Sequence, residues 1–342
     1  MAWTGVTRVL EISLCGLLMC CGFHTVPLLG TLEYLPSLEG HSIEFVYQSP
    51  PRVKGILFLA HGCNHNARDF WPKSDMCSSC LGLPEERKIV SASLAHNYFV
   101  VAISSAGTCW GTTVDTERVK AVISKIRQIR NMLHIPLYAI GASSGGAFVA
   151  RLPLHIPVAA VAVQIMFIPA SSLLKGPSAT TYPPSLWICM ERDHRTLEGV
   201  KKTVRTLTAR GRRAEVVVAT ALPITPTFFA LRIPTLGGKE QQGEHTSQTA
   251  LEISRRMYMV LQQGDALDGE GYLRQDPRVT TWRELLGDLR PSLLGDSLVA
   301  DVSAISEEMN VAYAMHEITA DFMTETINFF ESSSPPGLDS LR

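Results

Sequence analysis

The segment GASSGG, residues 141–146, follows a short apolar run at residues 137–140 and precedes a stretch with the pattern of a helix. A serine at such a junction stands on a sharp turn from strand to helix, where the backbone is strained and only small neighbours fit. The turn exposes the hydroxyl group beside a helix N-terminus, whose dipole favours developing negative charge. This segment therefore predicts a nucleophilic serine.

Two serines share this segment, and the spacing of the glycines favours Ser143 over Ser144. We choose Ser143 because the double glycine then begins two residues after the nucleophile. The alternative interpretation is a glycine-rich loop that binds phosphate through its main-chain amides. No lysine follows the double glycine, which excludes a Walker-type phosphate loop.

On both sides of this segment, apolar runs with the length of strands alternate with helical patterns. The predicted strands lie at residues 41–47, 55–60, 98–104, 137–140, 158–165, 185–190 and 214–221, and the predicted helices at 116–132, from 145 onward and at 196–209. This alternation predicts an α/β fold with a mostly parallel, doubly wound sheet and helices on both faces. The carboxyl ends of the strands then share one edge, where ligands and catalytic groups are expected to gather.

The chain changes character after its last predicted strand. Residues 223–311 show no convincing strand pattern, contain prolines near their start, and have helical patterns at residues 247–263, 282–289 and 300–308. We therefore expect a helical insertion or lid at about residues 223–311, after the last core strand.

A second glycine motif, His61-Gly62-Cys63, follows the apolar run at residues 55–60. The glycine allows the backbone to bend toward the end of the sheet, so that the amide of Cys63 can point at a substrate carbonyl oxygen. Together with the amide of Ser144, it would form a two-donor oxyanion hole. We expect His61 itself to be a buried imidazole that binds the loop.

The eight cysteines leave their oxidation state open. Cys77 and Cys80 form a CxxC motif, and Cys63 and Cys109 lie nearby in sequence, but no second CxxC or histidine pair stands at zinc spacing. Free thiols and one or two loop disulfides both remain compatible with this pattern, and we expect no metal site.

The first 36 residues form an apolar N-terminal segment. Arg8 precedes an apolar run at residues 12–23, whose length suits the core of a signal peptide and is short for a membrane span. Glu11 at its edge and the lack of an A-x-A site weaken the signal-peptide interpretation, and the absence of an N-x-S/T sequon disfavours a glycosylated, secreted protein. We expect a signal peptide or membrane anchor, hence the secretory pathway or membrane association, with an organelle or the cytoplasm as the alternative.

The amino-acid composition and net charge limit which classes of binding partner the protein can have. The chain of 342 residues is 46% hydrophobic and 18% charged, which is typical of a globular protein with a large core. Its 31 basic and 32 acidic residues give a net charge of −1, so it lacks the positive field that a nucleic-acid partner requires. The pattern does not determine an oligomeric state.

The order of these motifs resembles the α/β-hydrolase fold superfamily. The His-Gly motif after one strand and the GxSxGG turn after a later strand carry the resemblance, which covers about residues 41–331 and identifies no subfamily. It implies an α/β-hydrolase domain over residues 37–331 that includes the insertion, between the N-terminal segment 1–36 and a flexible tail 332–342. Members of the superfamily include esterases, lipases, thioesterases, peptidases and some non-enzymatic receptors.

The resemblance also implies an acid and a histidine later in the chain. The superfamily places the acid after the strand predicted at 185–190, which indicates Asp193, with Glu191 as the competitor. It places the histidine on a loop before the final helix, which indicates His316 over His194 and His245. One departure is the long stretch between the last strand and His316, where a short loop is usual.

The predicted function is therefore a serine hydrolase, a carboxylesterase or lipase-like enzyme acting on a small-molecule carboxylic ester. Ser143, His316 and Asp193 would form the triad, Cys63 and Ser144 the oxyanion hole, and no cofactor is required. Two alternatives stay open: an acyltransferase, which differs only in the acceptor, and a non-catalytic receptor that keeps the fold.

Overall fold

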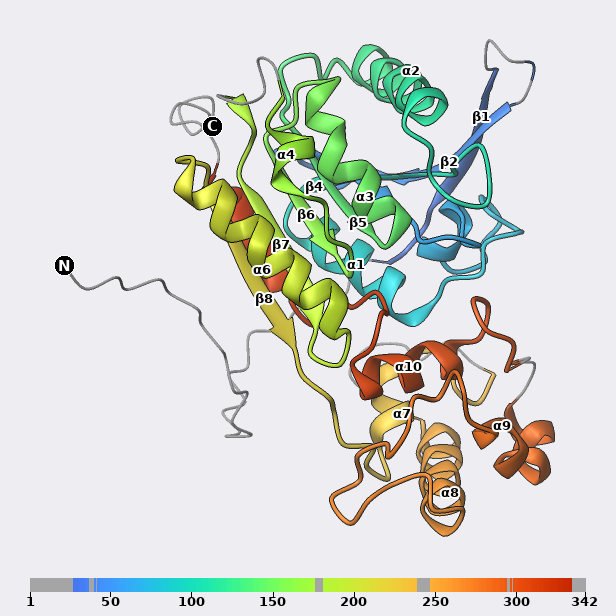
Figure 1. Ribbon diagram of the computed structural model, residues 1–342. Coiled ribbons are helices and arrows are strands. Elements are labelled where there is room, and N and C mark those ends of the chain that lie inside the picture. The colour runs from blue at the N-terminus through green and yellow to red at the C-terminus, as the bar shows by residue number, and fades with distance from the viewer. Residues whose placement is uncertain are drawn as a thin grey trace.

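The chain forms one central sheet of eight strands, and a group of helices lies beyond the carboxyl end of its last strand (Figure 1). The computed structural model describes residues 27–333 except for residues 37–39, 41, 176–180, 239–246, 294–295 and 297. The expected signal peptide or anchor within residues 1–26 and the expected tail beyond residue 333 lie outside the described residues.

The strand order across the sheet is β1-β2-β4-β3-β5-β6-β7-β8. The antiparallel pairs join β1 to β2 and β2 to β4, and all the remaining pairs are parallel. The strands are β1 (Thr31–Pro36), β2 (Ser42–Gln48), β3 (Gly55–Ala60), β4 (Tyr98–Ile103), β5 (Leu137–Ala142), β6 (Ala160–Gln164), β7 (Ser185–Met190) and β8 (Ala214–Ala219). The central strands β3 to β7 are buried throughout, as their continuous apolar runs require.

Helices cover both faces of the sheet. One face packs against α1 (Pro84–Ala95) and α11 (Met323–Glu331), through a core that includes Ile89, Leu94 and Phe330. The other face packs against α2 (Thr113–Ile129), α3 (Ser144–Arg151), α4 (Ala170–Leu173) and α6 (His194–Ala209). Short 3₁₀ turns, Ala67–Phe70 and Leu152–Leu154, lie in the connections. This arrangement confirms the predicted doubly wound α/β fold.

The helices that follow β8 form their own hydrophobic core. They are α7 (Phe228–Arg232), α8 (Gln248–Gln263), α9 (Trp282–Leu285), a 3₁₀ helix at Gly287–Leu293 and α10 (Ala304–Tyr313). Phe229, Met257, Leu261 and Met309 are fully buried among them. In Figure 1 these helices lie beyond the carboxyl end of β8. No strand occurs among the described residues of 223–311, so the prediction of a helical insertion after the last core strand is confirmed.

The sequence analysis missed strand β1 and helix α1, as well as the short helices α4 and α7. Strand β1 occupies Thr31–Pro36, inside the segment that was assigned to the N-terminal apolar stretch, and pairs with β2 in antiparallel register. Helix α1 begins with proline at its first position and has Glu85 and Glu86 in its first turn. Both features are ordinary helix-start signals, so this helix was readable from the sequence.

Candidate active site

Ser143 lies at the carboxyl end of β5, on the turn into α3. Its φ of 53° and ψ of −117° place it in a strained, positive-φ conformation. Its amide donates a hydrogen bond to the carbonyl of Gln164 at the end of β6, 3.0 Å away. This bond fixes the turn against the neighbouring strand and leaves the side chain partly exposed.

The glycines around Ser143 are required by close backbone approach. A Cβ at Gly145 would overlap the carbonyl oxygens of Ala60 and His61, and one at Gly141 would overlap the carbonyl of Gly145. The first turn of α3 therefore packs directly on the end of β3 and on the loop that follows it. This contact brings the predicted oxyanion loop next to the serine.

The structure brings Ser143, His316 and Asp193 together. The hydroxyl oxygen of Ser143 lies 3.0 Å from Nε2 of His316, and Nδ1 of His316 lies 2.8 Å from Oδ2 of Asp193. Asp193 follows β7, is 6% exposed, and also accepts a hydrogen bond from the amide of Thr196 as the N-cap of α6. Burial opposes the charge of Asp193, but the hydrogen bonds from His316 and Thr196 outweigh it and hold its pKa below the usual value.

The competing candidates lie elsewhere or are not described. The carboxylate of Glu191 accepts a hydrogen bond from the amide of Ala221, 2.7 Å away, and so caps the end of β8. His194 is exposed at the start of α6. His245 falls among residues that the structure does not describe.

The loop after β3 carries the predicted oxyanion donor. A Cβ added to Gly62 would lie 4.0 Å from the Cβ of Ser143, so this loop passes directly over the serine. Within the described part of the chain, no hydrogen-bond acceptor occurs for the amide of Cys63 or of Ser144. Both amides are thus available to a ligand, as an oxyanion hole requires.

His61 is a structural residue, as expected. It is 1% exposed, and burial lowers its pKa to about 4, so the imidazole is neutral. Its Nδ1 donates to the carbonyl of Gly62, and its Nε2 accepts from the amide of Ser105. The ring therefore ties the loop after β3 to the loop after β4.

Disulfides join the four cysteines of this region. Cys63 is bonded to Cys109, and Cys77 is bonded to Cys80, while Cys189 is a free, buried thiol among the described residues. The free-thiol alternative is therefore wrong for these four. Cys63 meets Cys109 because the loops after β3 and β4 lie side by side, with the amide of Asn64 donating to the carbonyl of Thr108, whereas Cys77 and Cys80 are close in sequence. The Cys63–Cys109 bond anchors the loop that carries the predicted oxyanion donor.

We expect the Cys63→Ser/Cys109→Ser double variant to lose both stability and activity. The bond closes a loop with a sequence separation of 46, for which chain entropy gives about 4 kcal/mol. The Cys77→Ser/Cys80→Ser variant is the control, because its separation of 3 makes the entropic contribution much smaller. Melting temperature and kcat/KM toward an ester check this, and equal losses in the two variants would contradict it.

A group of buried carboxyls lies between α1 and α10. Glu85, Glu86, Glu307 and Glu308 are each at most 5% exposed. Burial raises the pKa of Glu86 to about 7 and that of Glu307 well above its usual value. His65, which contacts Asp69 at 3.1 Å, keeps its charge: although burial opposes it, the Asp69 and Glu86 carboxyls raise its pKa to about 9.

These shifts predict that stability falls as the pH rises. A raised carboxyl pKa contributes stability that is present below about pH 4.5 and is lost as the pH passes through 7. For Glu86 the loss is on the order of 3 kcal/mol, and deprotonation of His65 acts in the same direction up to about pH 9. We expect the melting temperature to drop by several degrees between pH 5 and pH 8. Glu307→Gln, whose side chain stays neutral, should make the melting temperature less dependent on pH. A melting temperature that falls as steeply with pH as in the wild type would contradict the attribution to these buried carboxyls.

The serine turn after β5, Asp193 after β7 and His316 after β8 follow one another along the chain as the resemblance implied, and the sheet is mostly parallel as expected. The chain has the α/β-hydrolase fold. The long stretch before His316 does not disturb this path, because the insertion folds around its own core and returns the chain to the end of the sheet.

Solved structures with a similar architecture include several esterases. An esterase from Pyrococcus furiosus matches 57% of this chain and 84% of its own, at 14% identity and a TM-score of 0.39. Carboxyl esterase 2 from Tuber melanosporum matches 58% and 79%, at 12% identity and a TM-score of 0.41. Dienelactone hydrolase from Anabaena variabilis matches 56% and 87%, at 14% identity and a TM-score of 0.41.

No protein-family model matches the chain, and no curated protein matches it in sequence. Among the described residues, no group of three or more histidine, cysteine, aspartate or glutamate side chains is placed to hold a metal ion. In that same part of the chain, no helix is both long and apolar enough to cross a membrane.

Proposed function

We propose that this protein is a serine hydrolase that cleaves a carboxylic ester, with Ser143 as nucleophile, His316 as base and Asp193 as the acid that orients the histidine. One observation carries this proposal: a continuous chain of contacts, 3.0 Å from Ser143 to His316 and 2.8 Å from His316 to Asp193, at the carboxyl edge of the sheet. Such a chain gives a serine hydroxyl a route for its proton.

In the first half of the reaction, the Ser143 oxygen attacks the ester carbonyl while Nε2 of His316 takes the hydroxyl proton. Nδ1–H of His316 donates to Asp193, whose depressed pKa keeps it ionised beside the imidazolium. The amides of Cys63 and Ser144 donate to the carbonyl oxygen as it gains charge. The tetrahedral intermediate collapses, His316 returns the proton to the leaving alcohol, and an acyl-enzyme remains.

In the second half, water attacks the acyl-enzyme and gives its proton to His316. The carboxylic acid leaves, and the proton returns to Ser143. Only residues of this chain take part, so the reaction as proposed requires no cofactor.

We also propose that the insertion, at about residues 223–311, borders the entrance to this site as a lid. Asp301 of this segment accepts a hydrogen bond from the side chain of Asn64, 3.2 Å away, and lies 3.9 Å from Nε2 of His65. Asn64 adjoins Cys63, so the insertion meets the oxyanion loop directly.

A fluorophosphonate probe together with a panel of p-nitrophenyl esters of increasing acyl length tests this proposal. We expect a covalent adduct on Ser143 and release of p-nitrophenol from at least part of the panel. A wild-type chain that binds esters without an adduct or turnover would overturn the proposal and favour a receptor. Transfer of the acyl group to an added alcohol in preference to water would instead identify an acyltransferase.

A further inference from the structure

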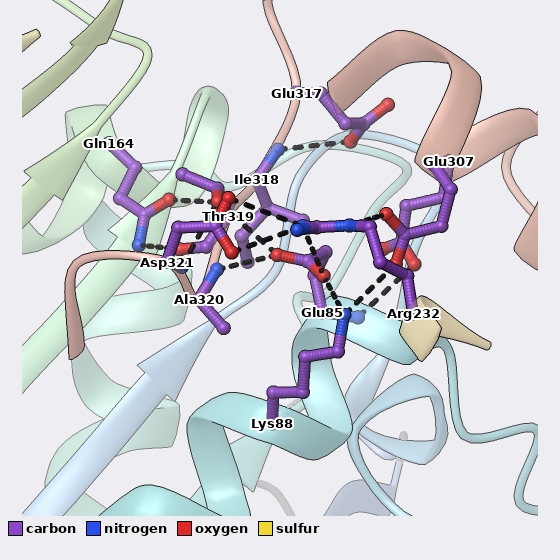
Figure 2. Close-up of polar contacts among 11 residues, drawn as sticks. Glu85, Lys88, Gln164, Arg232, Glu307, Glu317, Ile318, Thr319, Ala320 and Asp321 are labelled. Carbon is purple, nitrogen blue, oxygen red and sulfur yellow. Dashed lines mark hydrogen bonds and ion pairs between the residues drawn. The ribbon is translucent and has the colours of Figure 1, made fainter. Parts of the chain in front are cut away.

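Residues 317–322 connect His316 to the last helix, and buried side chains of the main domain hold this connection. Oε2 of Glu85, in α1, accepts hydrogen bonds from the amide of Ala320 at 2.7 Å and from the hydroxyl of Thr319 at 3.2 Å. Figure 2 shows Glu85 between this segment and the cations that surround its other oxygen.

Gln164 holds the same segment from β6. Its Oε1 accepts from the amide of Thr319, and its Nε2 donates to the carbonyl of Thr319, each at 2.9 Å. The carbonyl of Gln164 also accepts from the amide of Ser143 at 3.0 Å. One residue that is 1% exposed therefore contacts both the serine turn and the histidine loop.

Glu85 remains a carboxylate although it is fully buried. Burial opposes its charge, but Lys88 and Arg232 outweigh this effect and lower its pKa to about 2. Lys88 Nζ lies 2.5 Å and Arg232 Nη2 lies 3.1 Å from Oε1 of Glu85. Arg232 belongs to α7, and it also pairs with Glu308 of α10 and with Asp321 at 3.1 Å. The insertion thus supplies one of the charges that stabilise Glu85.

We propose that Glu85 and Gln164 are positioning residues that set the distance between Ser143 and His316. This inference rests on the proposed hydrolase function. Neither side chain contacts the reacting atoms; each holds residues 319–320, three and four positions after His316. His316 itself has a positive φ of 46°. Glu85 and Gln164 together bind both main-chain polar groups of Thr319 and the amide of Ala320, so loss of these bonds would let the imidazole move. A misplacement of about 1 Å can cost about 10²-fold in rate.

The test compares Glu85→Leu with Glu85→Gln in the full chain. Leucine removes the acceptor for Ala320 and Thr319, whereas glutamine keeps an amide oxygen in its place. Fluorophosphonate labelling counts the active sites, and kcat is then expressed per labelled site for a short p-nitrophenyl ester. We expect Glu85→Leu to lower kcat by about 10²-fold with KM nearly unchanged, and Glu85→Gln to stay within about fivefold of wild type.

The pH profile separates positioning from simple destabilisation. A loosened imidazole loses part of its contact with Asp193, which stabilises the protonated ring, so the acid limb of kcat/KM should move to lower pH in Glu85→Leu. Gln164→Met deletes the hydrogen bonds to Thr319 from the β6 side. It should show the same fall in kcat and the same shift of the acid limb, and it replaces Glu85→Leu in the test if that variant does not fold. Lys201→Met, on the exposed side of α6, is the control and should match wild type.

Wild-type kcat per labelled site and an unmoved acid limb in Glu85→Leu and Gln164→Met would overturn the inference, even if both variants melted at lower temperature. A wild-type chain that is not labelled at Ser143 would instead overturn the proposed function.

Discussion

Replacing Ser143 with alanine should lower kcat toward an ester by at least about 10³-fold, because the members of a triad act as a unit and the acyl-enzyme cannot form without the hydroxyl. The expected result also includes complete loss of fluorophosphonate labelling. Folding should be unaffected, because the hydrogen bond from the amide of residue 143 to the carbonyl of Gln164 involves only main-chain atoms. Steady-state kinetics on purified protein, with the melting temperature as the folding control, check this.

Ser144→Ala is the matched variant for this experiment. The hydroxyl of Ser144 is buried and has no hydrogen-bond partner in the described part of the chain, whereas its main-chain amide is a proposed oxyanion donor. Alanine keeps that amide, so we expect at most a few-fold loss. If Ser144→Ala lost activity and labelling while Ser143→Ala kept both, the choice between the two serines would have to be reversed.

Asp193→Asn should lower kcat by about 10³- to 10⁴-fold. The carboxylate accepts the Nδ1 proton of His316 at 2.8 Å, which leaves Nε2 free to take the proton of Ser143. An asparagine that turns its amide nitrogen to Nδ1 stabilises the opposite tautomer, and Nε2 then carries a proton and cannot act as a base. The remaining oxygen can still accept from Thr196, so the start of α6 should persist.

Glu191→Gln is the control for Asp193→Asn, since Glu191 was the competing acid. Its carboxylate caps the end of β8 through the amide of Ala221, and an amide oxygen can do the same. We expect kcat close to wild type. An Asp193→Asn variant that retained more than a tenth of the activity, or a Glu191→Gln variant that lost it, would show that the acid is misassigned.

The features of this site that depend only on residues close together in the sequence could be predicted from the sequence. The run GASSGG predicts a turn with a strained serine, and Ser143 has the positive φ of 53° that such a turn needs. The His-Gly motif predicts a loop that bends toward the serine, and Gly62 lies against it. Periodicity located nearly every core strand to within two or three residues, because apolar runs report burial directly.

The resemblance to a superfamily was needed to choose among the histidines. Nothing in the residues around His316 marks it as a base, and His194 and His245 are equally polar in sequence. The contact between Ser143 and His316 spans 173 residues, and a separate helical core is inserted within that span. The resemblance therefore indicated His316, and the tertiary structure brings its Nε2 to 3.0 Å from the hydroxyl oxygen of Ser143.

By itself, the sequence determined the positions of the core strands, the serine turn and the helical character of the insertion, because each follows from a pattern within a short stretch of the chain. Only the tertiary structure decided that Cys63 pairs with Cys109, that β1 completes the sheet edge, and that Glu85 holds the histidine loop. The bond from Glu85 to Ala320 joins residues 235 positions apart. No pattern in the neighbouring residues predicts such a contact, because the two residues meet only when the folded chain buries both of them.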